Sequence, residues 1–162
     1  MKKSKKYLVV IVSCVLLILQ VFPVYAEENS DTEWYEMVEE EYEAIENNGN
    51  DLVMPYTQYI MNVLTSMTKL SSSKIGMRAD VYCASTVQSI TVTFYLQKKS
   101  GSTWVNVASG TPSSATNVSS TAKQVTVSGI SSGTYRAKTV TRVVDQYGYS
   151  ESVTGYSGSL TI

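Results

Sequence analysis

The residues that could carry chemistry in this chain are few. Its 162 residues include no histidine and only two cysteines, Cys14 and Cys83. Without histidine there is no imidazole base for a Ser-His or Cys-His pair and no histidine ligand for zinc. Two cysteines are also too few for a four-cysteine metal site. We therefore expect no catalytic residue, no metal site and no cofactor, and we expect that the protein is not an enzyme.

Carboxylates are the remaining candidates for acid–base chemistry. Beyond residue 51 the chain has three of them, Asp80, Asp145 and Glu151. A glycosidase-like pair needs two carboxylates several ångströms apart in a cleft. Asp145 and Glu151 flank one predicted turn and are the candidate pair, although solvated loop acids are far commoner. Cys83 is either a reactive or intermolecularly bridged thiol or a small apolar core residue, and its place in an apolar alternation favours the core.

The first 26 residues have the pattern of a secretory signal peptide. Four lysines in residues 1–6 precede an almost wholly apolar run over residues 7–25, and Val24-Tyr25-Ala26 offers a cleavage site. The pattern predicts a secreted or cell-wall-associated protein that meets a membrane only through this segment before cleavage. An uncleaved anchor and a lipoprotein lipidated at Cys14 remain open alternatives.

Residues 27–51 and 52–162 carry opposite charge. The first segment has eleven acids and no base, whereas the second has nine bases and three acids, a charge of +6. A capping box from Ser30 to Glu33 predicts a short acidic helix over residues 31–46. Its apolar stripe comprises Trp34, Val38, Tyr42 and Ile45. Three alternatives stay open for this acidic segment: it is removed, it masks the basic domain, or it acts as a spacer.

The segment 52–162 is predicted to form strands. Ile75–Cys83 and Ile90–Leu96 alternate apolar and polar residues with period two, which is typical of half-buried strands. Turn signals separate about seven such segments, and this spacing favours an all-β, two-sheet sandwich. The expected strands cover residues 59–64, 75–83, 90–97, 104–108, 123–127, 135–144 and 152–162.

The stretch Gly129–Arg136 resembles the corner before strand F in fibronectin type III and other immunoglobulin-like domains. The resemblance implies a seven-stranded immunoglobulin-like antiparallel sandwich, with Tyr135 as the tyrosine of a tyrosine corner. It also implies a strand-B position for Cys83. The second cysteine of antibody domains is replaced by Ala137, so no disulfide is expected within the mature chain.

A second resemblance concerns the spacing of three short motifs. The chain resembles a group of small secreted Gram-positive proteins that are catalogued as a domain of unknown function. The motifs that carry this resemblance are Leu96-Gln97 and Trp104 around a turn, Gly133-Thr134-Tyr135-Arg136, and Gly148-Tyr149-Ser150-Glu151. The resemblance implies a compartment and a fold, and it implies no site.

One predicted surface could bind a partner. If Tyr135 and Ala137 face inward, the period-two alternation places a set of basic and aromatic side chains on the outer surface. This set comprises Arg136, Lys138, Arg142, Tyr95 and Gln97, with Lys98 and Lys99 at its end. Tyr147 and Tyr149, with Tyr156 beside them, form a second candidate patch for stacking on sugar rings. An ordinary solubilising surface is the plain alternative in both cases.

These features favour a secreted, non-catalytic binding module whose partner is an anionic wall polymer, a glycan or a surface protein. Nucleic acid is not expected as a partner, because a charge of +6 is modest and the chain is predicted to be exported. The alternative is an exported antagonist, or bacteriocin-like protein, whose acidic segment acts as a pro-segment.

Overall fold

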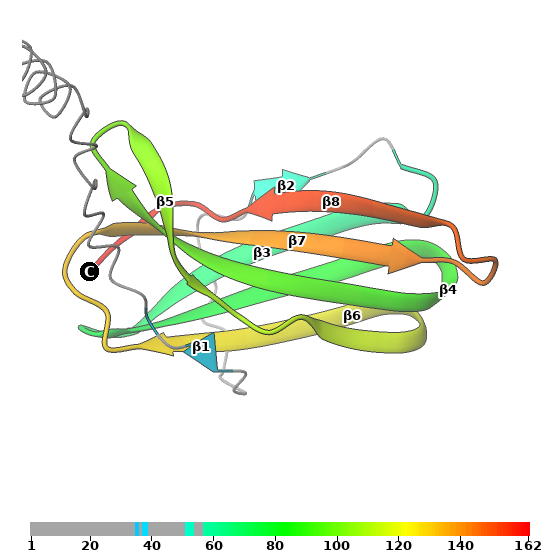
Figure 1. Cartoon of the computed structure of the whole chain (residues 1–162), viewed down its shortest axis with the longest axis horizontal. Coiled ribbons are helices and arrows are strands. Elements are labelled where there is room, and N and C mark those ends of the chain that lie inside the picture. The colour runs from blue at the N-terminus through cyan, green and yellow to red at the C-terminus, as the bar shows by residue number, and fades with distance from the viewer. Residues whose placement is uncertain (1–34, 36, 39–50, 54–56) are drawn as a thin grey trace, which may run out of the picture. The chain divides into compact units, whose positions relative to one another are not determined.

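The computed structural model describes residue 35 and residues 37–38, 51–53 and 57–162, and Glu33–Ile162 forms one compact unit. The expected signal peptide lies outside the described residues, as does most of the acidic segment. All regular structure in the described part is antiparallel strand (Figure 1). The strands are β1 (Met37–Val38), β2 (Asp51–Val53), β3 (Ile60–Ser71), β4 (Lys74–Ser100), β5 (Thr103–Ser109), β6 (Ser113–Ser128), β7 (Thr134–Val144), β8 (Ser150–Tyr156) and β9 (Leu160–Thr161). The described residues include no helix long and apolar enough to cross a membrane.

The expected all-β antiparallel fold is confirmed, but seven separate strands are not. The two segments expected at 75–83 and 90–97 belong to one strand, β4, which is 27 residues long. A register shift between Tyr82 and Val87 marks where β4 bends back at the right of Figure 1. The short strand expected at 123–127 is the end of β6, which is 16 residues long. Its Ser/Thr-rich first half lacks an apolar alternation, so pairing with β4 rather than local pattern decides its structure.

The two halves of β4 organise the sheet. Its first half lies between β3 and the second half of β6. Its second half pairs with β7, with β5 and with the first half of β6, and β8 and β9 continue the sheet from β7. The apolar positions of both halves are buried as the period-two pattern predicted, including Ile75, Met77, Val92 and Phe94.

The core also contains a close polar contact. The hydroxyls of Thr65 on β3 and Thr139 on β7 lie 2.6 Å apart and are both fully buried. Gly155 on β8 passes over them, where a Cβ atom would come within 2.5 Å of the Thr65 oxygen. Glycine is therefore required for β8 to approach this pair.

The tyrosine corner expected from the Gly129–Arg136 stretch is confirmed. Tyr135 is fully buried, and its hydroxyl donates a 2.8 Å hydrogen bond to the carbonyl oxygen of Ser131. Gly129 before the corner has φ +75°, a value that glycine adopts without a steric penalty.

The described part of the acidic segment is extended, so the predicted helix is wrong at these residues. Met37–Val38 pairs with Val127 and Thr126 of β6. The Tyr35 amide donates to the carbonyl of Val107 at 2.9 Å, and its ring is buried in the core. Long-range pairing has overridden the local helix signal here. The helix over residues 39–46 lies outside the described residues and stays a prediction.

Candidate functional site

A basic, aromatic face lies on the outer side of β4, β5, β7 and β8. We call this set of side chains the β7 face: Tyr95, Gln97, Trp104, Asn106, Arg136, Lys138, Arg142 and Tyr156. Along β7 the side chains alternate, so Tyr135, Ala137 and Thr139 are buried while the basic residues point away from the core. In the β4–β7 register Tyr95 lies opposite Lys138 and Gln97 opposite Arg136. The structure therefore brings together five of the residues selected from the sequence.

Arg136 lies at the centre of the β7 face. Its guanidinium carbon is 4.6 Å from the ring centroid of Trp104 and 4.4 Å from that of Tyr156. Because β5 and β8 lie on opposite sides of β7, the two rings approach from opposite directions. Contacts of this kind between a guanidinium and an aromatic face are attractive.

A chain of hydrogen bonds orients the guanidinium of Arg136. Its Nε donates to Gln97 Oε1 at 2.7 Å, and Gln97 Nε2 donates to Asn106 Oδ1 at 2.8 Å. Gln97 is buried beneath this contact. The N–H groups on the two Nη atoms of Arg136 have no partner among the described residues, so they are free to bind a ligand.

Lys138 makes a second contact of the same type. Its Nζ lies 5.3 Å from the ring centroid of Tyr95. Two residues along a strand separate Arg136 from Lys138, a spacing of about 7 Å. Arg142 follows near the β7–β8 turn and is exposed, with Nη2 3.4 Å from Ser150 Oγ.

Lys98 does not belong to this face, which corrects the sequence prediction. Its Nζ donates to Ser131 Oγ at 2.7 Å and lies 5.5 Å from the ring centroid of Tyr135. The alternation of β4 turns Lys98 to the side of Leu96, opposite to Gln97. Lys99 is exposed and pairs with Trp104 in the β4–β5 hairpin, so it lies at the margin of the face.

Sequence reasoning missed Trp104, Asn106 and Tyr156 as members of the β7 face. Tyr156 was grouped with the turn tyrosines, yet it pairs with Lys138, far along β8 from that turn. The Lys99–Ser102 turn was a usable signal for Trp104 and Asn106, because a tight hairpin places them opposite Lys99 and Gln97.

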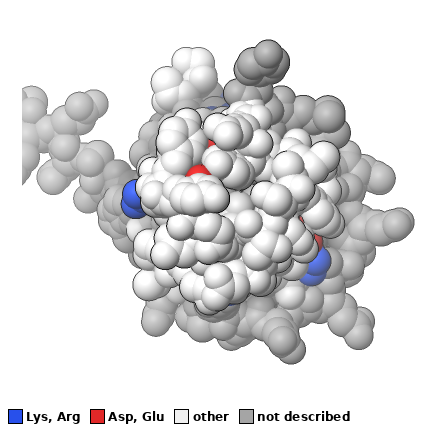
Figure 2. Space-filling view, turned by 90° about the vertical axis from the view of Figure 1, so that its right-hand side faces the viewer, with Lys and Arg blue, Asp and Glu red and all other residues white. Residues whose placement is uncertain are grey.

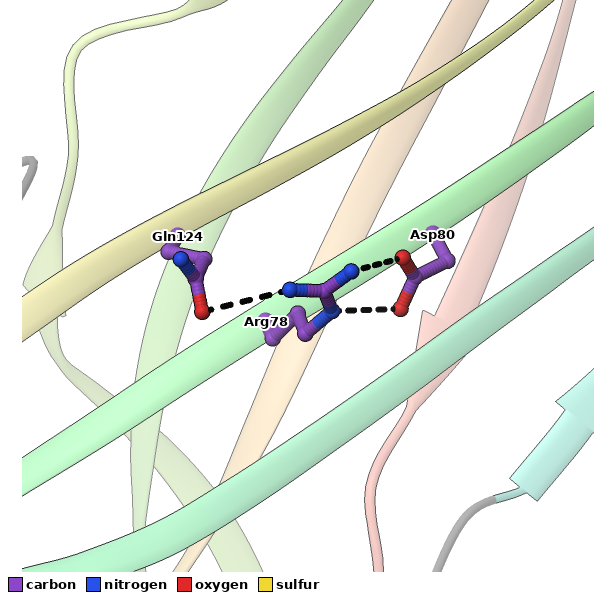
Figure 3. Close-up of polar contacts among 3 residues, drawn as sticks. All are labelled: Arg78, Asp80 and Gln124. Atoms are coloured by element: carbon purple, nitrogen blue, oxygen red, sulfur yellow. Dashed lines mark hydrogen bonds and ion pairs between the residues drawn. The ribbon is translucent and has the colours of Figure 1, made fainter. Parts of the chain in front are cut away.

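The β7 face contains no acid, because the acids with described side chains are used elsewhere. On the other half of the sheet Arg78 binds Asp80 through two hydrogen bonds of 2.8 and 2.6 Å and reaches Gln124 at 3.4 Å (Figure 3). Glu151 accepts hydrogen bonds from the backbone amides of Gln58, Tyr59 and Ile60. It thereby holds the start of β3 against β8.

Asp145 is buried beneath the β7–β8 turn. Its Oδ2 accepts the Tyr59 hydroxyl at 2.7 Å, and its Oδ1 accepts the amides of Tyr147 and Tyr149 at 2.9 and 2.8 Å. These hydrogen bonds, led by that of Tyr59, lower the pKa of Asp145, whereas its burial opposes the change. The same hydrogen bond raises the pKa of Tyr59, helped by burial and by the Asp145 charge. Asp145 and Glu151 thus both contact Tyr59. Asp145 stabilises the β7–β8 turn, and Glu151 stabilises the start of β3.

Cys83 lies at the end of the buried alternation in the first half of β4. It is a buried free cysteine, as the sequence pattern predicted. Burial, and to a smaller extent the charge of Glu151, raises the pKa of its thiol. Within the described residues no three His, Cys, Asp or Glu side chains lie close enough together to hold a metal ion.

Comparisons with known proteins give only remote structural likeness. The chain matches no protein-family model and no curated protein. Among solved structures it is similar to the GAE domain of GGA2p from Saccharomyces cerevisiae, with 12% sequence identity and a TM-score of 0.37 over 70% of this chain and 96% of that one. Similarity at this level carries no argument about function.

Proposed function

We propose that this protein is a secreted or cell-wall-associated, non-catalytic binding module that holds an anionic polymer on its β7 face. The observation that carries the proposal is the placement of Arg136, flanked by Trp104 and Tyr156 with its Nη donors free. A guanidinium held in this way presents planar donors to a phosphate or carboxylate at little further cost in side-chain entropy.

The spacing and charge of the face support a polymer rather than a single small anion. Arg136 and Lys138 lie about 7 Å apart along β7, and Arg142 extends the basic row by about 13 Å beyond Lys138. Tyr95, Gln97 and Trp104 flank the row and carry no charge. A linear polyanion with repeating charges can therefore lie along β7 without meeting an acid of the described residues.

The proposed scaffold is an immunoglobulin-like sandwich. The strand neighbours β3–β4–β6 and β5–β4–β7–β8 support this proposal, with strands B and C continuous in β4, and the first half of β6 joins the two groups into one sheet. The tyrosine corner at Tyr135 supports the same assignment. Export rests on the signal-peptide pattern of residues 1–26.

The non-catalytic part of the proposal rests on how the acids are used. Asp80 is paired with Arg78, Asp145 accepts three hydrogen bonds, and Glu151 binds three backbone amides. Each of these three carboxylates therefore stabilises a strand or a turn. No observation favours the antagonist alternative, because Tyr35 and Met37 of the acidic segment pack against the core.

The proposal is tested by binding to purified Gram-positive cell wall before and after hydrofluoric acid removes its phosphate polymers. We expect binding to the untreated wall that weakens with salt. Arg136→Gln with Lys138→Gln should weaken it about tenfold or more. Arg136→Lys keeps the charge but loses the planar donors, so we expect an intermediate loss.

Lys69→Gln is the matched control, because Lys69 is an exposed lysine on β3, away from the β7 face. Equal binding by the Arg136/Lys138 and Lys69 variants would reject the β7 face as the site. Binding that survives the acid treatment would assign the partner to the uncharged glycan or to a protein instead.

A further inference from the structure

A second surface lies at the end of the sheet where β7 turns into β8. Tyr147 is 94% exposed and Tyr149 56% exposed, so one short turn presents two aromatic rings to solvent. Figure 2 shows this end, which lies to the right in Figure 1, and most of the described surface visible there is uncharged. From Val143 to the C-terminal residue Ile162 the sequence contains no lysine or arginine.

The backbone of this turn is held rigidly. Asp145 Oδ1 accepts the amides of Tyr147 and Tyr149, while the Asp145 carbonyl accepts the Gly148 amide at 3.2 Å. The Asp145 amide donates to the Tyr149 carbonyl at 2.9 Å, and Gly148 has φ +86°. A turn closed by four hydrogen bonds presents its side chains from a fixed frame, which lowers the entropy lost when a ligand binds.

A third tyrosine, Tyr59, packs against the ring of Tyr149. The ring of Tyr59 lies 6.1 Å from that of Tyr149, tilted by 46°, and its hydroxyl is bonded to Asp145. The Tyr59 amide is in turn bonded to Glu151. Both carboxylates are therefore turned inward onto protein donors, and the outer surface of the turn is aromatic and uncharged.

We propose that Tyr147 and Tyr149 form a stacking platform for the sugar rings of a neutral carbohydrate. The C–H face of a pyranose ring packs well on an exposed aromatic face, and this contact needs no charge. A polyanion is disfavoured by Asp145 and Glu151 beneath the turn, and anionic lipid headgroups would find no cation on the turn.

The platform is distinct from the β7 face. Arg136, the centre of that face, lies nine positions before Asp145, about 30 Å along the chain, whereas Arg142 at the end of the face lies three positions before it, about 10 Å away. The two surfaces could thus bind different parts of one glycan-containing structure, and either proposal stands if the other fails.

The test is saturation-transfer difference NMR of the full-length protein with cellohexaose, maltoheptaose and chitohexaose, three uncharged oligosaccharides. We expect transfer to at least one of them that is insensitive to NaCl between roughly 0.05 and 0.5 M. Tyr147→Ala and Tyr149→Ala should each lower the transferred saturation roughly fivefold or more, while Tyr147→Phe keeps the ring and the signal.

Val105→Ala is the matched control, since Val105 is an exposed apolar residue on β5, opposite Lys98 and thus near the other end of the sheet. Arg136→Gln should also leave the signal unchanged. Far-UV circular dichroism confirms that each variant is folded. No transfer to any of the three sugars, or equal transfer in the alanine variants, would overturn the proposal. Sedimentation with neutral phosphatidylcholine vesicles that depends on Tyr147, without sugar binding, would overturn it in favour of a membrane.

Discussion

Hydrogen bonds around Ser131 link several residues at one end of the core. The Tyr135 hydroxyl binds the Ser131 carbonyl, and the Ser131 hydroxyl accepts Lys98 Nζ and lies 2.8 Å from the hydroxyl of Tyr35. Five polar groups of four residues therefore meet at one end of the core.

Tyr135→Phe is expected to lower the free energy of unfolding by about 1–2 kcal/mol, because the Ser131 carbonyl loses its donor. Urea denaturation measures the change. Tyr82→Phe is the control, since Tyr82 is 46% exposed and should be close to neutral. An unchanged midpoint for Tyr135→Phe would contradict the energetic importance of the corner.

Cys83 is expected to react slowly with thiol reagents in the native protein, because it is buried and its raised pKa keeps the thiol protonated. Cys83→Ser should cost about 1–3 kcal/mol by burying a hydroxyl, and Cys83→Ala should cost less. Labelling with a chromogenic disulfide, with and without denaturant, measures the protection. Equal rates in both conditions would show that Cys83 is accessible.

The Asp145–Tyr59 hydrogen bond predicts two limits to stability as pH changes. The Asp145 pKa is lowered by folding, so its contribution is present above the unfolded value of about 3.9 and is lost as pH falls through the folded pKa. The Tyr59 pKa is raised, so its contribution is present below about pH 10 and is lost as pH rises through the folded pKa.

Urea midpoints measured from pH 2 to pH 11 test these limits. Tyr59→Phe should reduce the loss at both ends, since it removes the Tyr59 proton and the strongest hydrogen bond to Asp145. Identical pH profiles for the variant and the natural sequence would contradict the assignment.

At the scale of elements, strand β1 closes a gap between β5 and β6. Tyr35 binds the Val107 carbonyl of β5, and Met37–Val38 pairs with β6. The Met37 sulfur lies over Gly110, where a Cβ atom would come within 2.8 Å of it. The acidic segment therefore contributes directly to the core at these residues.

Tyr35→Ala is expected to lower the free energy of unfolding by about 2–4 kcal/mol, because it removes a buried ring and both of its contacts with Ser131. Val105→Ala, at an exposed residue of β5, should change it by less than about 0.5 kcal/mol. Thermal unfolding followed by circular dichroism measures both. A chain truncated before residue 52 lacks Tyr35 and should be destabilised at least as much as Tyr35→Ala, whereas equal stability would show that β1 is dispensable.

At the scale of the whole described unit, β4 is the central strand of the sheet. It pairs with β3, β5, β6 and β7, so the two halves of the sheet share one backbone. We therefore expect one cooperative unfolding transition. In a Trp34→Phe variant Trp104 is the remaining indole, and its fluorescence should change at the same temperature as the far-UV circular dichroism. An earlier change in Trp104 would show that the β5 side unfolds independently.

The sequence by itself determined which side of each main strand faces the core. Alternation of apolar and polar residues is a local property, and it predicted the buried positions of β4 and the outward direction of Arg136, Lys138 and Arg142. The corner at Tyr135 was also visible, because a glycine turn and a tyrosine lie within a few residues. The division of charge between residues 27–51 and 52–162 needed composition alone.

The tertiary structure alone decided which side chains meet. Trp104 and Tyr156 come to Arg136 from strands on either side of β7, and Tyr35 reaches Ser131 across 96 residues of sequence. No local pattern encodes such pairings, because they depend on the register of strands far apart in the chain. The same reason explains the error at Met37–Val38, where pairing with β6 prevailed over the helix signal.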